Sequence, residues 1–372
     1  MKLKTAEQLV NEVTKLALRL DSATVSDEDI DRGLELINEV HAFLDQGDRD
    51  TSSNCVAVLG ATGVGKSTVV SLLFGQGRLL VHHEDEYSRV NVAENPLPGV
   101  DIQSGSLSKT LLPGVVRASF GGTPMLVFDM PGTQDTRGPF AELVAHSVLK
   151  WLVVNRRNVR FLIVATPPQE RSQEVKLADT INRTCTSGSN AVLVYTKCDP
   201  DFDPKATRTM KTLNPKSRNI PAFALPTPRK SDEEGQDYSS PHREMILRVL
   251  RELTVPVVES KTFAEVVPDS AQLLLRNFCN RSIEIARHAL SQIFISTYHP
   301  RGARYSLSTV VELLSMLENP DPLSFETIVG QMQQLVENPR CIDGDPGVQR
   351  AVARLKLMEM WCGGELIRCK DE

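Results

Sequence analysis

A glycine-rich segment at residues 60–67 combines residue types whose spacing suits the binding of phosphate groups. Glycines let successive backbone N–H groups converge on phosphate oxygens, where a larger side chain would block the approach. The ammonium group of Lys66 can reach the outer phosphates of a nucleotide, and the hydroxyl of Ser67 suits Mg²⁺. The segment therefore predicts a nucleotide-phosphate site. Its members are Gly60, Ala61, Thr62, Gly63, Val64, Gly65, Lys66, Ser67 and Thr68.

Asp129 and Gly132 form a second group that could act on phosphate. An apolar run at residues 126–128 delivers the Asp129 carboxylate to the end of a buried strand, where it can hold Mg²⁺ through a water molecule. The N–H of Gly132 can approach the terminal phosphate. A D-x-x-G pattern is weak by itself, but here it follows a glycine-rich phosphate segment. The sequence predicts a magnesium site that includes Ser67 and Asp129.

A third group, Thr196, Lys197 and Asp199, ends another apolar run and could recognise a base. The Asp199 carboxylate can accept hydrogen bonds from N1–H and the 2-amino group of guanine. Adenine presents an acceptor in that position and would leave the desolvated carboxylate unpaired, so discrimination can be severe. The stem of Lys197 would lie along the base and ribose. The expected ligands are GTP and GDP.

The elements that must position these groups alternate between strand and helix from residue 54 onward. We predict strands at 55–60, 115–120, 124–129, 159–166, 191–196 and 219–224, and helices at 66–74, 138–155, 169–182 and 241–252. This alternation predicts an α/β domain with a mostly parallel six-stranded sheet. The short link at residues 121–123 allows only a hairpin, so one edge should be antiparallel. We expect residues 75–113 to form a long loop, with a solvated charged stretch at 82–86.

The two ends of the chain have helical periodicity and predict an all-α part. An apolar stripe predicts a helix at residues 5–20. A second helix should begin after Ser26 and has its apolar face at residues 30–44. Further apolar stripes predict helices around 275–293, 307–317, 325–335 and 348–361. Each helix has one apolar face and needs a partner. We therefore expect an N-terminal helical pair at 1–47, a nucleotide domain at 54–255 and a C-terminal helical domain at 262–372 that packs with 1–47.

Composition limits the remaining classes of function. The 372-residue chain has a formal net charge of −5, which argues against nucleic acid as a partner. Its start lacks the apolar core of a secretory signal, and its seven cysteines form no C-x-x-C pair. These features favour a cytoplasmic protein with reduced thiols.

The three groups together resemble the GTPase superfamily over residues 54–228. Asp129-Met130-Pro131-Gly132 and Thr196-Lys197-Cys198-Asp199 are more similar to the dynamin-related and interferon-inducible (immunity-related) GTPases than to Ras. Septins and the immune-associated nucleotide-binding proteins are similar relatives. The resemblance implies hydrolysis of GTP with Mg²⁺, association with a second copy through the nucleotide domain, an unidentified protein effector, and in many members a peripheral location at membranes.

The resemblance also implies two further parts of the site. A threonine before the second strand of the domain should complete the magnesium coordination and serve catalysis with Lys66 and Gly132; Thr110 is the choice, with Ser106 and Ser108 as rivals. A loop behind the base should follow the sixth strand, where Ala224 and Leu225 fit.

Residue 133 departs from the Ras-like pattern. Ras-like enzymes place a water-orienting glutamine directly after the D-x-x-G glycine, whereas this chain has Thr133 and only then Gln134. Intrinsic hydrolysis should then be slow unless a partner or a second copy completes the site. Two alternatives to a GTPase stay open: a nucleotide-gated interaction module with negligible turnover, and an ATP-using P-loop enzyme.

Overall fold

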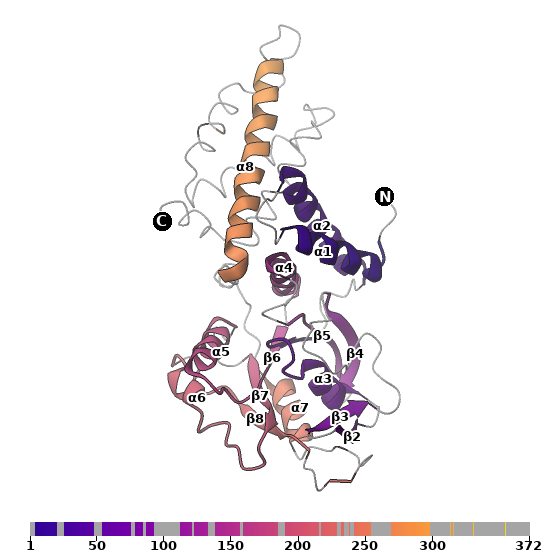
Figure 1. The fold of residues 1–372 in the computed structure, drawn as a ribbon, viewed down its shortest axis with the longest axis vertical. Helices are drawn as coiled ribbons and strands as arrows, with labels where there is room; N and C mark the ends of the chain where they lie inside the picture. Colours follow the sequence, from indigo (N-terminus) through magenta and orange to yellow (C-terminus); the bar gives the residue numbers. More distant parts are fainter. Residues whose placement is uncertain are drawn as a thin grey trace. The chain divides into compact units, whose positions relative to one another are not determined.

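The structure is a computed structural model that describes most of the chain up to residue 297 (Figure 1). The described residues are 4–20, 26–47, 54–75, 79–84, 87–92, 112–120, 123–132, 138–156, 159–184, 190–215, 217–228, 232–233, 238, 242–253 and 269–297, with 313, 315, 330 and 354. They divide into two compact units. The nucleotide unit comprises residues 44–137 and 144–262, and the helical unit comprises residues 1–43, 138–143 and 263–372.

The nucleotide unit is built on a six-stranded sheet in the order β4-β5-β1-β6-β7-β8. Its strands are β1 (Asn54–Leu59), β4 (Gly114–Phe120), β5 (Thr123–Asp129), β6 (Val159–Ala165), β7 (Ala191–Cys198) and β8 (Ala222–Pro226). All neighbours are parallel except β4 and β5, which pair antiparallel at one edge. The predicted α/β sheet with one edge hairpin is therefore confirmed.

One face of this sheet packs against two helices, α3 (Lys66–Phe74) and α7 (Arg243–Glu252). Alternate residues of the strands, such as Val56 and Val58 of β1, meet apolar side chains of both helices in a single core. The side chain of Arg243 donates hydrogen bonds of 2.7 and 3.1 Å to the carbonyls of Leu72 and Leu73. These bonds satisfy carbonyls at the end of α3, which have no partner within the helix.

Three more helices belong wholly or partly to the nucleotide unit: α4 (Pro139–Asn155), α5 (Arg171–Thr184) and the short α6 (Arg208–Thr212). The helices expected at 66–74, 138–155, 169–182 and 241–252 are present, with ends that differ by at most two residues. The sequence did not predict α6. Its five residues carry no apolar period, and the hydroxyl of Thr207 caps it by accepting from the N–H of Met210.

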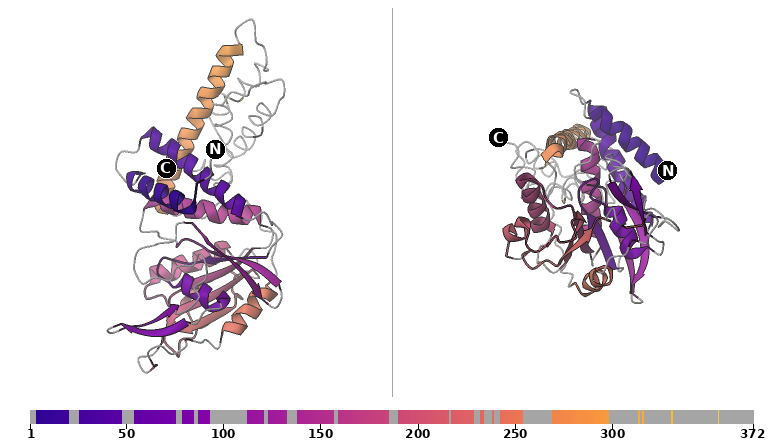
Figure 2. Two further views of the ribbon diagram at one scale, coloured as in Figure 1. Left: turned by 90° about the vertical axis from the view of Figure 1, so that its right-hand side faces the viewer. Right: turned by 60° about the horizontal axis from the view of Figure 1, so that its bottom comes forward.

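The expectation that residues 75–113 form a loop throughout is wrong. This stretch contains an antiparallel two-stranded sheet of β2 (Leu79–Glu84) and β3 (Tyr87–Val92), and it extends beyond the main sheet (Figure 2). Leu79 and Val81 are buried, as a short strand requires, but the charged residues at 82–86 interrupt the pattern. Register with β3 places His82 opposite Arg89, so His82 lies in a strand rather than a loop.

The helical unit contains α1 (Ala6–Leu20), α2 (Asp27–Gly47, of which residues up to 43 belong here) and α8 (Asp269–Thr297). Ser26 begins α2 as expected, because its hydroxyl accepts from the N–H of Asp29 at 3.2 Å. Helices α2 and α8 pack closely: a Cβ on Gly33 would lie 2.6 Å from the ring of Phe278. Arg281 of α8 forms ion pairs with Asp27 and Asp31 of α2 at 2.9 and 3.5 Å.

Most of the C-terminal helices expected beyond residue 300 lie outside the described residues. Leu313, Ser315, Gly330 and Arg354, which fall within the three expected stretches, are helical. Arg354 is buried and donates a 2.7 Å hydrogen bond to Asp31 of α2. Among the described residues, no helix is long and apolar enough to cross a membrane.

Candidate functional site

The phosphate loop joins the end of β1 to the start of α3. Gly60 has a φ of +153°, and a Cβ there would lie 2.2 Å from the carbonyl oxygen of Val164 in β6. Only glycine fits, because both the backbone conformation and the space exclude a side chain. Gly65, with a φ of +93°, stands directly before the N-terminus of α3. The loop therefore aims the positive end of a helix dipole at the phosphate position.

Lys66 begins α3 and folds back over this loop. Its Nζ donates hydrogen bonds to the carbonyl oxygens of Gly60 at 3.1 Å and Ala61 at 3.0 Å, and the residue is 8% exposed. The ammonium group is thus held at the mouth of the loop by backbone dipoles. Phosphate oxygens carry full charge and can replace or join these carbonyls as partners.

Ser67 and Asp129 meet across the gap between α3 and β5. The Ser67 hydroxyl donates a 2.7 Å hydrogen bond to Oδ2 of Asp129, which is 2% exposed. Burial raises the pKa of the Asp129 carboxyl, while the Ser67 hydrogen bond and the charge of Lys66 act in the opposite direction. The second oxygen, Oδ1, is buried and has no hydrogen-bond partner among the described residues. A buried carboxylate oxygen without a partner is costly unless a ligand satisfies it.

This arrangement fits a magnesium ion. Mg²⁺ prefers hard oxygen ligands and is usually held by one or two protein groups, with phosphates and waters completing the coordination. Ser67 Oγ and the free Oδ1 of Asp129 supply such oxygens. Within the described part of the chain no cluster of three His, Cys, Asp or Glu residues could hold a metal by itself. Ser67 and Asp129 are the residues that would bind the ion together with a nucleotide.

The segment after β5 returns to the phosphate loop. A Cβ built on Gly132 would lie 2.4 Å from Oγ1 and 2.8 Å from the backbone nitrogen of Thr62. No side chain fits at residue 132 without displacing the loop. The structure therefore brings Gly132 and Thr62 together, as a common phosphate site requires.

The end of β7 is tied to the same loop. The hydroxyl of Thr196 donates hydrogen bonds to the carbonyls of Val64 and, at 3.3 Å, Ala165. Lys197 has a left-handed φ of +55°, and its Nζ donates a 2.8 Å hydrogen bond to the carbonyl of Gly63. The register between β7 and β8 shifts at this point. Such a bulge turns a side chain out of the sheet, here toward the phosphate loop.

Asp199 follows β7 directly and is exposed, so its carboxylate is accessible to a ligand. Cys198 before it is buried, and burial raises the pKa of its thiol to about 12. It therefore stays a thiol at neutral pH and contributes packing rather than chemistry. Ala224 and Leu225 of β8 pair with Tyr195 and Thr196 of β7. The side chain of Leu225 belongs to the core, so only its backbone could face a base.

Tyr238 lies in the charged and polar stretch 229–240, and nothing in the sequence singled it out. Its hydroxyl donates a 2.8 Å hydrogen bond to the carbonyl of Pro226 at the end of β8, and its N–H donates to Leu79 of β2 at 2.6 Å. Burial raises the pKa of Tyr238 to about 12. Tyr238 thus fastens the end of β8 to β2. A lone tyrosine in a polar stretch gave no signal for this contact.

Several predicted residues lie outside the described part of the chain. Thr110 and its rivals Ser106 and Ser108 are among them, as are Thr133 and Gln134. The predicted roles of these residues stay predictions.

Comparison with known proteins adds little to this site. No family model and no curated protein matches the chain. Toc33 from Arabidopsis thaliana in complex with Mg²⁺ and GMPPNP is 19% identical over 58% of this chain and 90% of its own, with a TM-score of 0.36. The GDP form I of the cytosolic domain of the T. maritima FeoB iron transporter is 13% identical over 82% and 96%, with a TM-score of 0.31. Both TM-scores lie below 0.5, and the assignment of the site therefore depends on its own residues.

Proposed function

We propose that this protein binds GTP with Mg²⁺ and hydrolyses it to GDP and phosphate. One observation carries the proposal: the phosphate loop, Asp129 with Gly132, and the end of β7 follow the carboxyl ends of parallel strands in one sheet, and hydrogen bonds and close contacts join them. Ligands of open α/β sheets bind at this edge. The predicted phosphate, metal and base groups come from three separate parts of the sequence, so their convergence is not a property of any single motif.

Each group has a defined role in this reaction. The loop N–H groups and Lys66 stabilise the phosphate charge. Ser67 and Asp129 would hold Mg²⁺, which would offset the negative charge of the phosphates. Water attacks the terminal phosphorus in line, and the bond to the bridging oxygen breaks to release GDP. Thr196 and Lys197 hold the loop, and Asp199 selects guanine. Thr110 is the proposed additional magnesium ligand.

We also infer that the chain belongs with the dynamin-related or immunity-related type of GTPase. Two features support this placement: the D-M-P-G and T-K-C-D forms of its motifs, and the helices that precede and follow the nucleotide domain. We accordingly propose that the protein is cytoplasmic, associates with a second copy and binds membranes peripherally. In this proposal the helical unit couples the nucleotide state to an effector.

A second candidate function is a nucleotide-gated interaction module with negligible turnover. The observation that favours it is Thr133 in the place of the water-orienting glutamine. Turnover per molecule, measured over a wide range of protein concentration with ATP as control, separates the two. Rate per molecule that rises with concentration supports a GTPase completed by a second copy. Tight GTP binding without turnover at any concentration supports the module.

The guanine assignment is tested by Asp199→Asn. Asparagine presents an amide to N1–H of guanine, and we expect the affinity for GDP to fall by about 10- to 100-fold, since a good hydrogen bond to a charged group contributes roughly 1.5–3 kcal/mol. Affinity for xanthosine diphosphate should rise. Binding of both nucleotides is measured by fluorescence titration. The matched control is Asp201→Asn, an exposed aspartate two residues further on, which should leave both affinities unchanged. Unaltered GDP affinity in Asp199→Asn would contradict the assignment.

A further inference from the structure

The hydroxyl of Thr62 differs from the other polar groups of the phosphate loop. The carbonyls of Gly60 and Ala61 accept from Lys66, that of Gly63 accepts from Lys197, and that of Val64 accepts from Thr196. Thr62 Oγ1 is buried and has no hydrogen-bond partner among the described residues. The protein thus holds the loop at four backbone carbonyls, whereas the side-chain hydroxyl of Thr62 between them has no partner among the described residues.

Other threonine hydroxyls of this protein donate to backbone carbonyls. Thr196 does so with two, and Thr14, Thr180 and Thr212 each donate to a carbonyl three or four residues earlier. An unsatisfied buried hydroxyl lowers the stability of the protein. Such an atom calls for an explanation, and a bound ligand that accepts its hydrogen bond is one.

The surroundings of Thr62 indicate which ligand atom could satisfy it. Its Oγ1 lies 2.4 Å from the place that a Cβ of Gly132 would occupy, so the hydroxyl lies directly beside the D-x-x-G segment. Oδ1 of Asp129, three residues before Gly132 in the same segment, is also buried and without a partner among the described residues. Thr62 Oγ1 therefore lies beside the segment that follows β5, which is expected to contact the terminal phosphate. The inner phosphates, by contrast, belong at the N-terminus of α3 and over the N–H groups of residues 63–67.

We propose that the Thr62 hydroxyl binds the terminal phosphate of the nucleotide and makes the loop favour the triphosphate over the diphosphate. The proposal rests on the proposed function and deepens it. Thr62 donates its hydrogen to a terminal phosphate oxygen beside the N–H of Gly132, so both groups contact a phosphate that GDP lacks. Thr62 is then a specificity-determining residue that the glycine-rich pattern itself does not require.

The test uses two variants of the full chain, Thr62→Val and Thr62→Ser. Valine keeps the shape and β-branching of threonine and removes the hydroxyl, whereas serine keeps the hydroxyl. Dissociation constants for GDP and for a non-hydrolysable GTP analogue are measured with Mg²⁺. We expect Thr62→Val to lose about tenfold in affinity for the analogue, from about 1.4 kcal/mol for a charge-assisted hydrogen bond, with unchanged GDP affinity. Thr62→Ser should keep the wild-type ratio of the two affinities.

The outcomes separate failure of this inference from failure of the proposed function. An unchanged ratio in Thr62→Val overturns the inference, because the hydroxyl would then not contact the terminal phosphate. A gain in analogue affinity also overturns it and indicates that the side chain obstructs that phosphate. Unchanged GDP binding shows that the variant is folded. If the wild-type protein binds neither nucleotide, the proposed function itself is wrong.

Discussion

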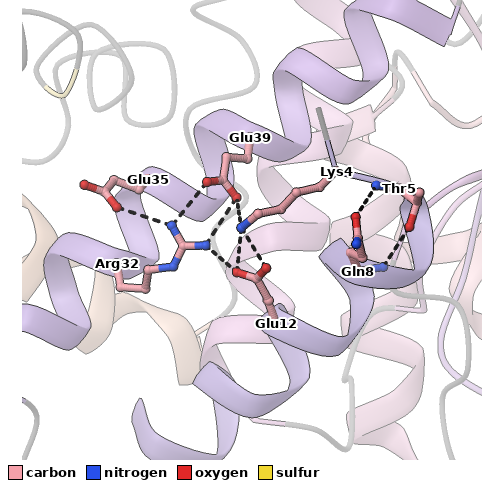
Figure 3. Close-up of polar contacts among 7 residues, drawn as sticks. All are labelled: Lys4, Thr5, Gln8, Glu12, Arg32, Glu35 and Glu39. Carbon is pink, nitrogen blue, oxygen red and sulfur yellow. Dashed lines mark hydrogen bonds and ion pairs between the residues drawn. The ribbon is translucent and has the colours of Figure 1, made fainter. Parts of the chain in front are cut away.

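Two regions of this protein gather charged side chains in opposite ways. At the phosphate loop, one buried carboxylate oxygen and one buried hydroxyl have no partner among the described residues. Between α1 and α2 of the helical unit, two cations and three carboxylates satisfy one another (Figure 3). The first region resembles a ligand-binding site, and the second resembles an ion-pair network that stabilises the contact between two helices.

The α1–α2 network consists of Lys4, Glu12, Arg32, Glu35 and Glu39. Lys4 Nζ lies 2.7 Å from Glu12 and 2.9 Å from Glu39, and Arg32 contacts Glu12, Glu35 and Glu39. Partial burial alone would lower the pKa of Arg32, but its hydrogen bonds to Glu39 and Glu12 raise it. Thr5 and Gln8 cap the start of α1 beside this network. The N–H of Thr5 donates a 2.9 Å hydrogen bond to Oε1 of Gln8, and the N–H of Gln8 donates a 3.3 Å hydrogen bond to Oγ1 of Thr5.

This difference teaches that charge by itself does not mark a functional site. Removing a member of the satisfied network should cost stability, because it leaves a partner uncompensated. Removing the charge of an unsatisfied buried group should relieve the empty protein and harm the ligand complex. The two regions should therefore respond to mutation with opposite signs in stability.

The largest expected effect is that of Asp129→Asn. Loss of the carboxylate should lower the Mg²⁺-dependent affinity for nucleotide by at least about 100-fold, since charged hydrogen bonds and metal contacts contribute roughly 3 kcal/mol or more. The nucleotide-free protein should become more stable, because asparagine removes a charge that burial disfavours, as the upward shift of the Asp129 pKa indicates. Calorimetric Tm without nucleotide and titration of GDP with and without Mg²⁺ measure both effects.

Asp199→Asn is the matched control for this stability effect. It makes the same chemical change at an exposed aspartate of the same site, so the Tm without nucleotide should not change. A lower Tm for Asp129→Asn would show that the buried carboxylate stabilises the empty fold, and the contrast between the two regions would disappear.

Arg32→Met should produce the next largest effect, in the opposite direction. Methionine fills much of the same space but leaves three carboxylates with one cation, and we expect a loss of about 1–3 kcal/mol in the free energy of unfolding. Urea unfolding measures the loss. Arg19→Met is the control: Arg19 lies on α1 with 61% of its side chain exposed and should cost less than about 0.5 kcal/mol. Equal losses in both variants would contradict a special role for the network.

The smallest predicted effect is the pH dependence of the network through Glu12. The hydrogen bond from Lys4 lowers the Glu12 pKa, that from Arg32 lowers it further, and partial burial opposes both. A carboxyl group whose pKa is lowered by folding stabilises the protein above its unfolded value, about 4.3, and this contribution is lost as the pH falls through the folded value. The difference in stability between wild type and Glu12→Gln should be constant from about pH 5 to pH 7 and shrink below about pH 4. A difference that does not depend on pH would show that Glu12 acts by packing alone.

The main sheet was predictable because its strands are local patterns. The buried residues 55–59 read as a continuous apolar run followed by glycine, and the two glycines at 121–122 permit only a hairpin. The β2–β3 sheet was not predictable, because its apolar alternation covers only Leu79 and Val81 before charges interrupt it. Its pairing arises from contacts that short-range periodicity does not record.

The sequence by itself determined which residues are candidates for binding phosphate, metal and base. The spacing of the glycines, with Lys66 and Ser67, predicts a phosphate site. The strand ends that carry Asp129, Gly132 and Asp199 predict the metal and base groups, because parallel strands place their carboxyl ends at one edge of the sheet. Only the tertiary structure decided which polar atoms are satisfied. Thr62 Oγ1 and Asp129 Oδ1 are left without a described partner, whereas the carbonyls of Gly63 and Val64 find Lys197 and Thr196 more than 130 residues away. Hydrogen-bond partners at such separations depend on how the chain folds back on itself, and no local pattern of residues encodes them.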